Sequence, residues 1–320
     1  MKKFVVGVSA WLDPGCTVHA QTLLRTLTVA IDWSPGVSNL SFVYGNDEAT
    51  ATTAAEVAHR FTAEGVDAVI GPFGSGALMG AVEAYEAAGI PVIAPAATID
   101  LPRRYSNLFR ICPNDRLLAA EVARRVRERG FERVAVLSDD SIHYRGLRDR
   151  IHALLESTAA DDGGEPGVDA IIYTGRLKPS NEWLKTERAS GMMLPVIMTD
   201  DAAAADLLDG VDDPGDLEVV GFPTAHQIPG AAVMAARYQR HYRSPPPIYF
   251  LEVLAAIEAV AQARRSSRPL AQSLSSGTFL TVFGPTRFVD GERVSATLAL
   301  WAPGPDGRLQ SRSVIEPAGP

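Results

Sequence analysis

Residues 68–98 read AVIGPFGSGALMGAVEAYEAAGIPVIAPAAT and contain one complete β-α-β unit. The apolar run at 68–70 predicts a short strand, and a glycine-rich loop separates it from a helical stretch over 78–88. Residues 91–94 predict the next strand, which ends in a loop of small residues. Because strands joined by a crossover helix run parallel, both loops are expected at the same edge of one sheet.

The same alternation extends along most of the chain. The expected strands are 4–8, 40–44, 68–70, 91–94, 133–137, 170–173, 195–198, 217–220 and 297–301. Between them, apolar residues recur every three or four positions, as in 52–63 and 117–129, which predicts amphipathic helices. Repeated β-α-β units predict parallel sheets with helices on both faces. The pattern falls into two blocks that meet near Ile111, so we expect an α/β fold of two doubly wound parallel-sheet lobes.

Composition excludes several classes of protein. The 320 residues carry 30 Lys and Arg against 38 Asp and Glu, a net charge of −8 that disfavours a nucleic-acid partner. No apolar run approaches the roughly 18–20 residues of a membrane span, so membrane insertion is not expected. Cys16 and Cys112 are too few for a disulfide framework or a metal site, and no cofactor is expected. The tail after the turn at 303–307 is polar.

The amino terminus leaves the location of the protein open. Met1, Lys2 and Lys3 give the basic start of a signal peptide, but neither a long apolar core nor a small-residue cleavage site follows. The protein is therefore cytoplasmic if Met1 is the natural start. Alternatively, a signal was removed and a start methionine added.

Ligands of open parallel sheets bind beyond the carboxyl ends of the strands. The loop at 71–76 combines glycines, which allow close backbone approach, with a helix start whose unpaired N–H groups suit a carboxylate or phosphate. Ser75 adds a hydroxyl, which serves either a ligand or the helix N-cap. Thr98 closes the next β-α unit and is expected beside Ser75. The loop is neither a Walker loop nor a GxGxxG motif.

Acidic residues follow strands in the second block. Asp200 comes after the strand at 195–198 and is the best-placed acid to hold an ammonium group. Asp139 and Asp140 are expected as helix N-caps rather than ligand contacts. Paired carboxylates also suit metal binding or acid–base chemistry, but no third ligand or Ser-His-Asp pattern accompanies them. We therefore do not expect an enzyme.

VIGPFGSG at 69–76, YEAAGIPVIAPAAT at 85–98 and NLFR at 107–110 together resemble type I periplasmic binding proteins. The nearest group is the branched-chain amino acid (Leu/Ile/Val) binding proteins of ABC transporters, and the likeness continues through 133–140, 146–147 and 284–288. The resemblance implies two lobes joined by a three-strand hinge. It places residues 1–111 and 227–281 in lobe 1, and residues 112–226 and 282–320 in lobe 2.

The resemblance also implies ligand contacts. The hydroxyls of Ser75 and Thr98 and main-chain groups near Ala96 would hold an amino-acid carboxylate. Asp200 would pair with its ammonium group.

The chain departs from the family pattern at three positions near these contacts. His143 with Tyr144 stands where Tyr-Gly is usual, and Arg176 stands where a tyrosine is common. Arg176 favours a second anionic group on the ligand if it points toward the ligand, and has no bearing on it if it points to solvent. Trp11 offers an apolar wall in a first loop that lacks the usual glycines.

The sequence thus predicts a receptor that delivers an amino acid or related small carboxylated molecule to an ABC transporter permease by hinge closure. The family implies a periplasmic or extracytoplasmic location. The alternative is a cytoplasmic sensor of the same fold that responds to amides or amino acids, which the missing signal peptide favours. An enzyme is a third reading, and it lacks a nucleophile–base pair or a cofactor motif.

Overall fold

The computed structural model describes residues 3–13, 18–101, 105–156, 159–160 and 167–316, so Cys16 lies outside the described residues. The chain divides into two compact units. Unit 1 comprises Met1–Pro113 and Thr224–Ala296, and unit 2 comprises Asn114–Pro223 and Thr297–Pro320. The chain therefore passes from one unit to the other after residues 113, 223 and 296.

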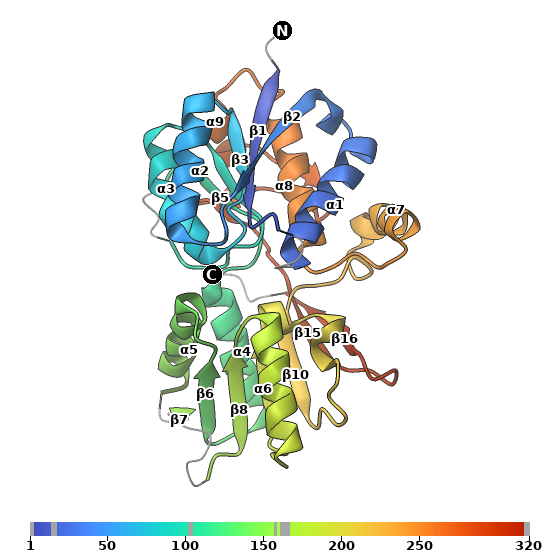
Figure 1. The fold of residues 1–320 in the computed structure, drawn as a ribbon. Helices are drawn as coiled ribbons and strands as arrows, with labels where there is room; N and C mark the ends of the chain where they lie inside the picture. The colour runs from blue at the N-terminus through green and yellow to red at the C-terminus, as the bar shows by residue number, and fades with distance from the viewer. Residues whose placement is uncertain (1–2, 14–17, 102–104, 157–158, 161–166, 317–320) are drawn as a thin grey trace. The chain divides into compact units, whose positions relative to one another are not determined.

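Unit 1 is a doubly wound α/β unit. Its elements are β1 (Phe4–Ala10), α1 (Val18–Trp33), a 3-10 turn (Val37–Asn39), β2 (Leu40–Asn46), α2 (Ala51–Glu64), β3 (Ala68–Ile70), α3 (Ser75–Ala87), β4 (Val92–Ala94), β5 (Leu108–Arg110), a 3-10 turn (Pro229–Ala231), α7 (Ala232–Tyr242), α8 (Phe250–Ala263), α9 (Leu270–Ser276), β11 (Phe279–Thr281), β12 (Gly284–Thr286), β13 (Phe288–Val289) and β14 (Glu292–Arg293). The sheet order is β13-β14-β5-β4-β3-β1-β2, and the strands from β5 to β2 are parallel. Figure 1 shows α2 and α3 on one face of this sheet and α1 and α8 on the other.

The core of unit 1 lies between its sheet and its helices. Phe61 of α2 and Leu78 and Tyr85 of α3 are fully buried against Val69 and Val92 of the sheet. The buried residues of each helix recur at spacings of three, four and seven positions, which is the amphipathic pattern that predicted both helices. The apolar strands are buried on both faces, as parallel strands between two helical layers must be.

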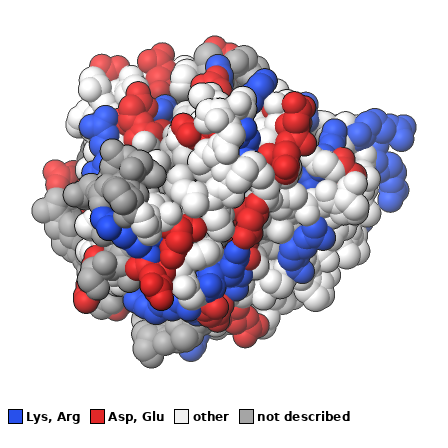
Figure 2. All heavy atoms as spheres, turned by 90° about the horizontal axis from the view of Figure 1, so that it is seen from below, with Lys and Arg blue, Asp and Glu red and all other residues white. Residues whose placement is uncertain are grey.

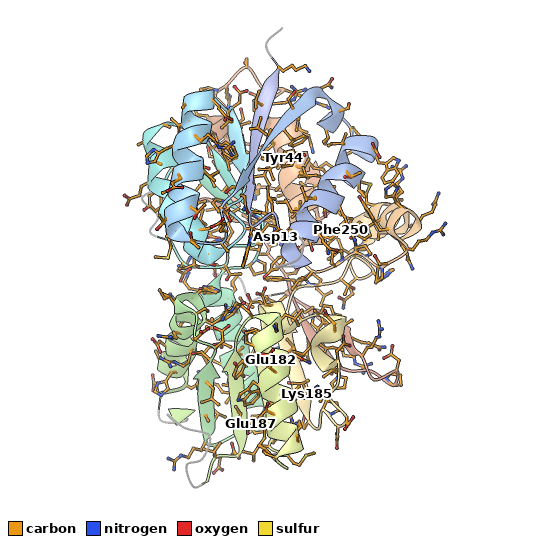
Figure 3. All side chains as sticks on the ribbon, in the orientation of Figure 1. Asp13, Tyr44, Glu182, Lys185, Glu187 and Phe250 are labelled. Atoms are coloured by element: carbon orange, nitrogen blue, oxygen red, sulfur yellow. The ribbon has the colours of Figure 1, made fainter. Side chains whose placement is uncertain are left out.

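Unit 2 repeats this architecture with an antiparallel extension. Its elements are α4 (Asp115–Arg129), β6 (Val134–Ser138), α5 (Ile142–Leu155), β7 (Ala159–Ala160), β8 (Ala170–Thr174), α6 (Leu177–Ala189), β9 (Val196–Thr199), 3-10 turns (Asp200–Ala202 and Ala205–Leu208), β10 (Leu217–Gly221), β15 (Leu298–Pro303) and β16 (Leu309–Ile315). The sheet order is β16-β15-β10-β9-β8-β6-β7, with β15 and β16 antiparallel to their neighbours. Helix α6 buries Leu184 in the core, while Glu182 and Lys185, labelled in Figure 3, lie on its exposed side.

One expectation about the chain's last third is wrong. Residues 282–296, expected in lobe 2, belong to unit 1, because β14 pairs with β5 at the edge of its sheet. The polar tail after the turn at 303–307 forms a strand, because β16 pairs with β15 along its length. Most side chains of β16 are exposed or half-buried, so its sequence carries little of the apolar signal that marks a strand.

No helix in the described ranges is long and apolar enough to cross a membrane. Figure 2 shows acidic and basic side chains interspersed over most of the face it presents.

Gly80 of α3 is packed against α2 so closely that a β-carbon there would lie 2.1 Å from the carbonyl oxygen of Ala51. We therefore expect Gly80→Ala to lower the free energy of unfolding by about 1–3 kcal/mol, since the backbone must shift to admit a methyl group. Gly76→Ala in the same helix is the matched control, because its nearest neighbour is 3.8 Å away. It is expected to raise stability by roughly 0.5 kcal/mol. Urea denaturation measures both, and equal effects would contradict the packing.

Candidate functional site

The strand order of unit 1 reverses at β1, which lies between β3 and β2. Ligands of doubly wound sheets bind outside the carboxyl ends of strands at such a reversal. Gly71, directly after β3, has φ +107°, and a β-carbon there would lie 2.1 Å from the carbonyl oxygen of Ser9 in β1. Glycine at this position therefore allows the loop to pass against the end of β1.

Ser75 lies at the start of α3 but does not cap it. The N-cap residue is Gly74, and Ser75 is the first helical residue. Ser75 is buried, and its Oγ accepts a hydrogen bond from the backbone N–H of Ile99 at 3.4 Å. The hydroxyl thus contacts the loop that follows β4, as expected from the parallel pairing of β3 with β4.

Ala96 and Thr98 lie in that same loop, and both are buried. We call Ser75, Ala96 and Thr98 the hydroxyl cluster of unit 1. It combines two hydroxyl groups, small side chains and the first turn of α3, whose N–H groups and partial positive charge attract anions. The cluster is chemically suited to a carboxylate.

Trp11 is the first residue after β1, at the same edge of the sheet, and its side chain is half-buried. The end of β1 is held by a pair that the sequence did not reveal. The hydroxyl of Ser9 donates to Oδ2 of Asp47 at 2.8 Å, and the backbone N–H of Ala49 donates to Oδ1 at 2.9 Å. Asp47 is fully buried, and burial raises the pKa of its carboxyl despite these hydrogen bonds.

In unit 2 the strand order reverses between β6 and β8, and an ion pair lies there. Nε of Arg176 donates to Oδ2 of Asp139 at 2.7 Å, and its Nη2 binds Asp140. Burial alone would raise the pKa of Asp139. Hydrogen bonds from the side chains and backbone of Arg176 and Ser141 outweigh burial and hold this pKa below its usual range. The side chain of Arg176 is 51% exposed, and two carboxylates balance its charge. Of the two orientations considered from the sequence, this favours the one in which Arg176 points to solvent rather than toward a ligand.

Neither Asp139 nor Asp140 caps helix α5, contrary to expectation. The N-cap is Ser141, whose Oγ accepts the backbone N–H of Tyr144 at 3.2 Å. Asp139 instead accepts the backbone N–H of Ser141, so it shapes the turn before the helix.

Asp200 follows β9 and is 1% exposed. The hydroxyl of Tyr144 donates to its Oδ2 at 3.3 Å, and its Oδ1 accepts no hydrogen bond from the described residues. Burial, followed by the charges of Asp201 and Asp115, raises the pKa of Asp200 well above its usual range. A buried carboxyl beside two other acids favours a cation as its partner.

His143 and Asp115 lie in the same unit. Nδ1 of His143 is 3.7 Å from Oδ2 of Asp115, and the imidazole packs on the ring of Tyr144 with centroids 4.6 Å apart. Asp115 is the first residue of α4, so the helix begins two residues before the predicted stretch at 117–129. We call Asp115, His143, Tyr144 and Asp200 the acidic cluster of unit 2.

Two further features concern possible metal ligands and the one cysteine in the described part of the chain. It contains no group of three or more His, Cys, Asp or Glu residues arranged to hold a metal ion. Cys112 is a free, buried thiol, and burial raises its pKa.

Comparisons with known proteins agree on one family. The model of a family described as periplasmic binding protein matches residues 36–216. The Leu/Ile/Val-binding protein homolog 2 of Brucella abortus is 24% identical, over 95% of this chain and 92% of its own. Among solved structures, the branched-chain amino acid transporter substrate-binding protein of Streptococcus pneumoniae, in complex with isoleucine, is 19% identical. It matches with a TM-score of 0.86 over 99% of this chain and all of its own.

A second solved structure is the solute-binding protein of an ABC transporter from R. palustris, in complex with benzoate. It is 15% identical and has a TM-score of 0.84, over 99% of this chain and 98% of its own. At these identities the likeness to solved structures shows the fold, and the bound molecules belong to those proteins alone.

Asp200 and Asp139 are expected to affect the stability of the folded protein in opposite directions as the pH changes. Because the pKa of Asp200 is raised in the folded protein, its contribution to stability falls as the pH rises above the unfolded value of 3.8. Asp200→Asn removes the charge and still accepts the Tyr144 hydroxyl, so it should be more stable than the parent protein at about pH 7.5, with the gain shrinking toward about pH 4.

Asp139→Asn is the matched control, since the pKa of Asp139 is lowered and its contribution is lost as the pH falls. It should cost about 1 kcal/mol near neutral pH, given the exposure of Arg176. Urea denaturation at several pH values measures both variants, and a loss of stability in Asp200→Asn at neutral pH would contradict the assignment.

Proposed function

Because the chain belongs to the periplasmic binding protein family, we propose that it is a receptor for an amino acid or a related small carboxylated molecule. The receptor would deliver this ligand to an ABC transporter permease, binding it without chemical change. The observation that carries the proposal is the contact between Ser75 and the loop containing Ala96 and Thr98.

The hydroxyl cluster of unit 1 would hold the ligand's carboxylate. Ser75 and Thr98 are both buried, and a hydroxyl can donate to a carboxylate oxygen. Charge-assisted hydrogen bonds of this kind are about twice as strong as neutral ones. Trp11, at the same edge of the sheet, would contribute apolar surface.

The acidic cluster of unit 2 would hold the ligand's ammonium group. Burial, followed by the charges of Asp201 and Asp115, raises the pKa of Asp200 well above its usual range. An ammonium group next to it would stabilise the charged form and supply a partner to the buried Oδ1. His143, beside Asp115, would shape this end of the site rather than bind a metal.

Among carboxylated ligands, these acids favour an amino acid over a simple carboxylic acid. A benzoate-like ligand carries no cation, so it gives Asp200 nothing to pair with. The relatives named for Leu, Ile and Val support an apolar amino acid as the first candidate. We further propose that the protein acts outside the cytoplasm, as the family name implies.

The two ends of the ligand can be tested separately. Calorimetry would compare L-leucine with 4-methylpentanoate, which has the same carboxylate and side chain but no ammonium group. Asp200→Asn should weaken L-leucine binding by at least about 30-fold and leave 4-methylpentanoate nearly unchanged. Ser75→Ala should weaken both by roughly 10-fold, because both ligands keep the carboxylate.

Asp206 is an exposed acid in the 3-10 turn Ala205–Leu208. Asp206→Asn is the control and should change the affinity for neither ligand. Equal loss of both ligands in Asp200→Asn would contradict the assignment of the ammonium site. If none of L-leucine, L-isoleucine, L-valine, 4-methylpentanoate or benzoate binds the parent protein, the proposed ligand class is wrong.

A further inference from the structure

Arg110, the last residue of β5, is a buried cation with two different partners. Its side chain is 3% exposed. Nη1 donates to the carbonyl oxygen of Ala97 at 2.5 Å, and Nε donates to the carboxylate of Glu292 at 3.1 Å and 3.3 Å. The guanidinium therefore joins the loop after β4 to β14 at the edge of the sheet.

Ala97 lies between the two residues of the hydroxyl cluster that this loop provides, Ala96 and Thr98. The loop reads Pro-Ala-Ala from residue 95, and none of these three side chains can donate or accept a hydrogen bond. The hydrogen bonds that fix its buried main chain must therefore come from residues outside the loop. Arg110 donates to the carbonyl oxygen of Ala97, as does the Cys112 thiol at 3.6 Å, and Ser75 accepts the N–H of Ile99.

Glu292 is held in place by the backbone as well as by its charge. It is paired with Arg110 in parallel register, and the N–H of Arg110 donates to the carbonyl oxygen of Gly291 at 2.7 Å. The next residue, Arg293, donates from Nε to the carbonyl oxygen of Ile111 at 2.7 Å. Both residues of β14 thus bind the end of β5, a few residues before the chain leaves unit 1.

We propose that Arg110 and Glu292 form a positioning pair that sets the conformation of the loop at 95–99. This inference rests on the proposed function, in which that loop holds the ligand's carboxylate. The pair carries no net charge, so it acts through geometry rather than by attracting the ligand. Glu292 fixes the orientation of the guanidinium plane, and the plane in turn fixes the carbonyl of Ala97.

A purely structural ion pair would affect global stability alone. A positioning pair also makes the loop locally ordered, and this is visible without any ligand as slow hydrogen exchange of the Ile99 amide. Lysine at position 110 keeps the charge but has no planar fork, so it cannot hold both partners in the same geometry.

Hydrogen exchange of the ligand-free protein tests the inference in three variants. We expect Arg110→Lys to speed exchange over residues 95–101 by at least 10-fold, and Glu292→Gln to do so to a smaller extent. Gly80→Ala is the matched control, because it loosens unit 1 through the contact between α2 and α3 without touching this loop. Exchange in β9 of unit 2 should be the same in all of them.

Faster exchange at 95–101 in Arg110→Lys than in Gly80→Ala, at the same loss of global stability, supports the positioning role. Equal exchange in the two variants overturns it, and Glu292→Gln decides the matter if Arg110→Lys does not fold. L-leucine calorimetry is then the second readout, with about 10-fold weaker binding expected in Arg110→Lys. Failure of the parent protein to bind any of the five ligands named under the proposed function would refute that ligand class, while the exchange result would still support or overturn the positioning role by itself.

Discussion

The parallel pairing of β3 with β1 and β4 is the constraint on which the site of unit 1 depends. It sends the chain out of the sheet at one edge, where Gly71 passes against the backbone of Ser9. Once that edge is fixed, Ser75 must face the loop that follows β4, and its hydroxyl meets the N–H of Ile99. The sheet itself therefore brings the backbones around Ser75 and Ile99 together, and only a few side chains are needed to complete the contact.

Most of the fold follows from local patterns, and so does the proximity of Ser75 to the loop that follows β4. Ser75 and Thr98 were predictable because both end β-α units that are adjacent in sequence. Glu292 was not, because 182 residues separate it from Arg110 and its strand is two residues long. Local periodicity carries no signal for so short an edge strand.

The polar residues of unit 2 show a second limit of sequence reasoning. Asp139 and Asp200 both follow strands and look alike in the sequence, yet Arg176 stabilises the charge of one while burial opposes the charge of the other. Only the three-dimensional surroundings separate a carboxyl that supports the fold from one that strains it. Strongly perturbed carboxyls of the second kind cluster at functional sites.

The order in which the chain is made gives the position of β14 a further meaning. The ribosome reaches β14 only after every strand from β1 to β10 has been made. Until then β5 has an open edge, and the carbonyl of Ala97 has only half of the pair that holds it. A nascent chain that has not yet reached β14 therefore lacks the carboxylate that orients Arg110 beside the loop at 95–99.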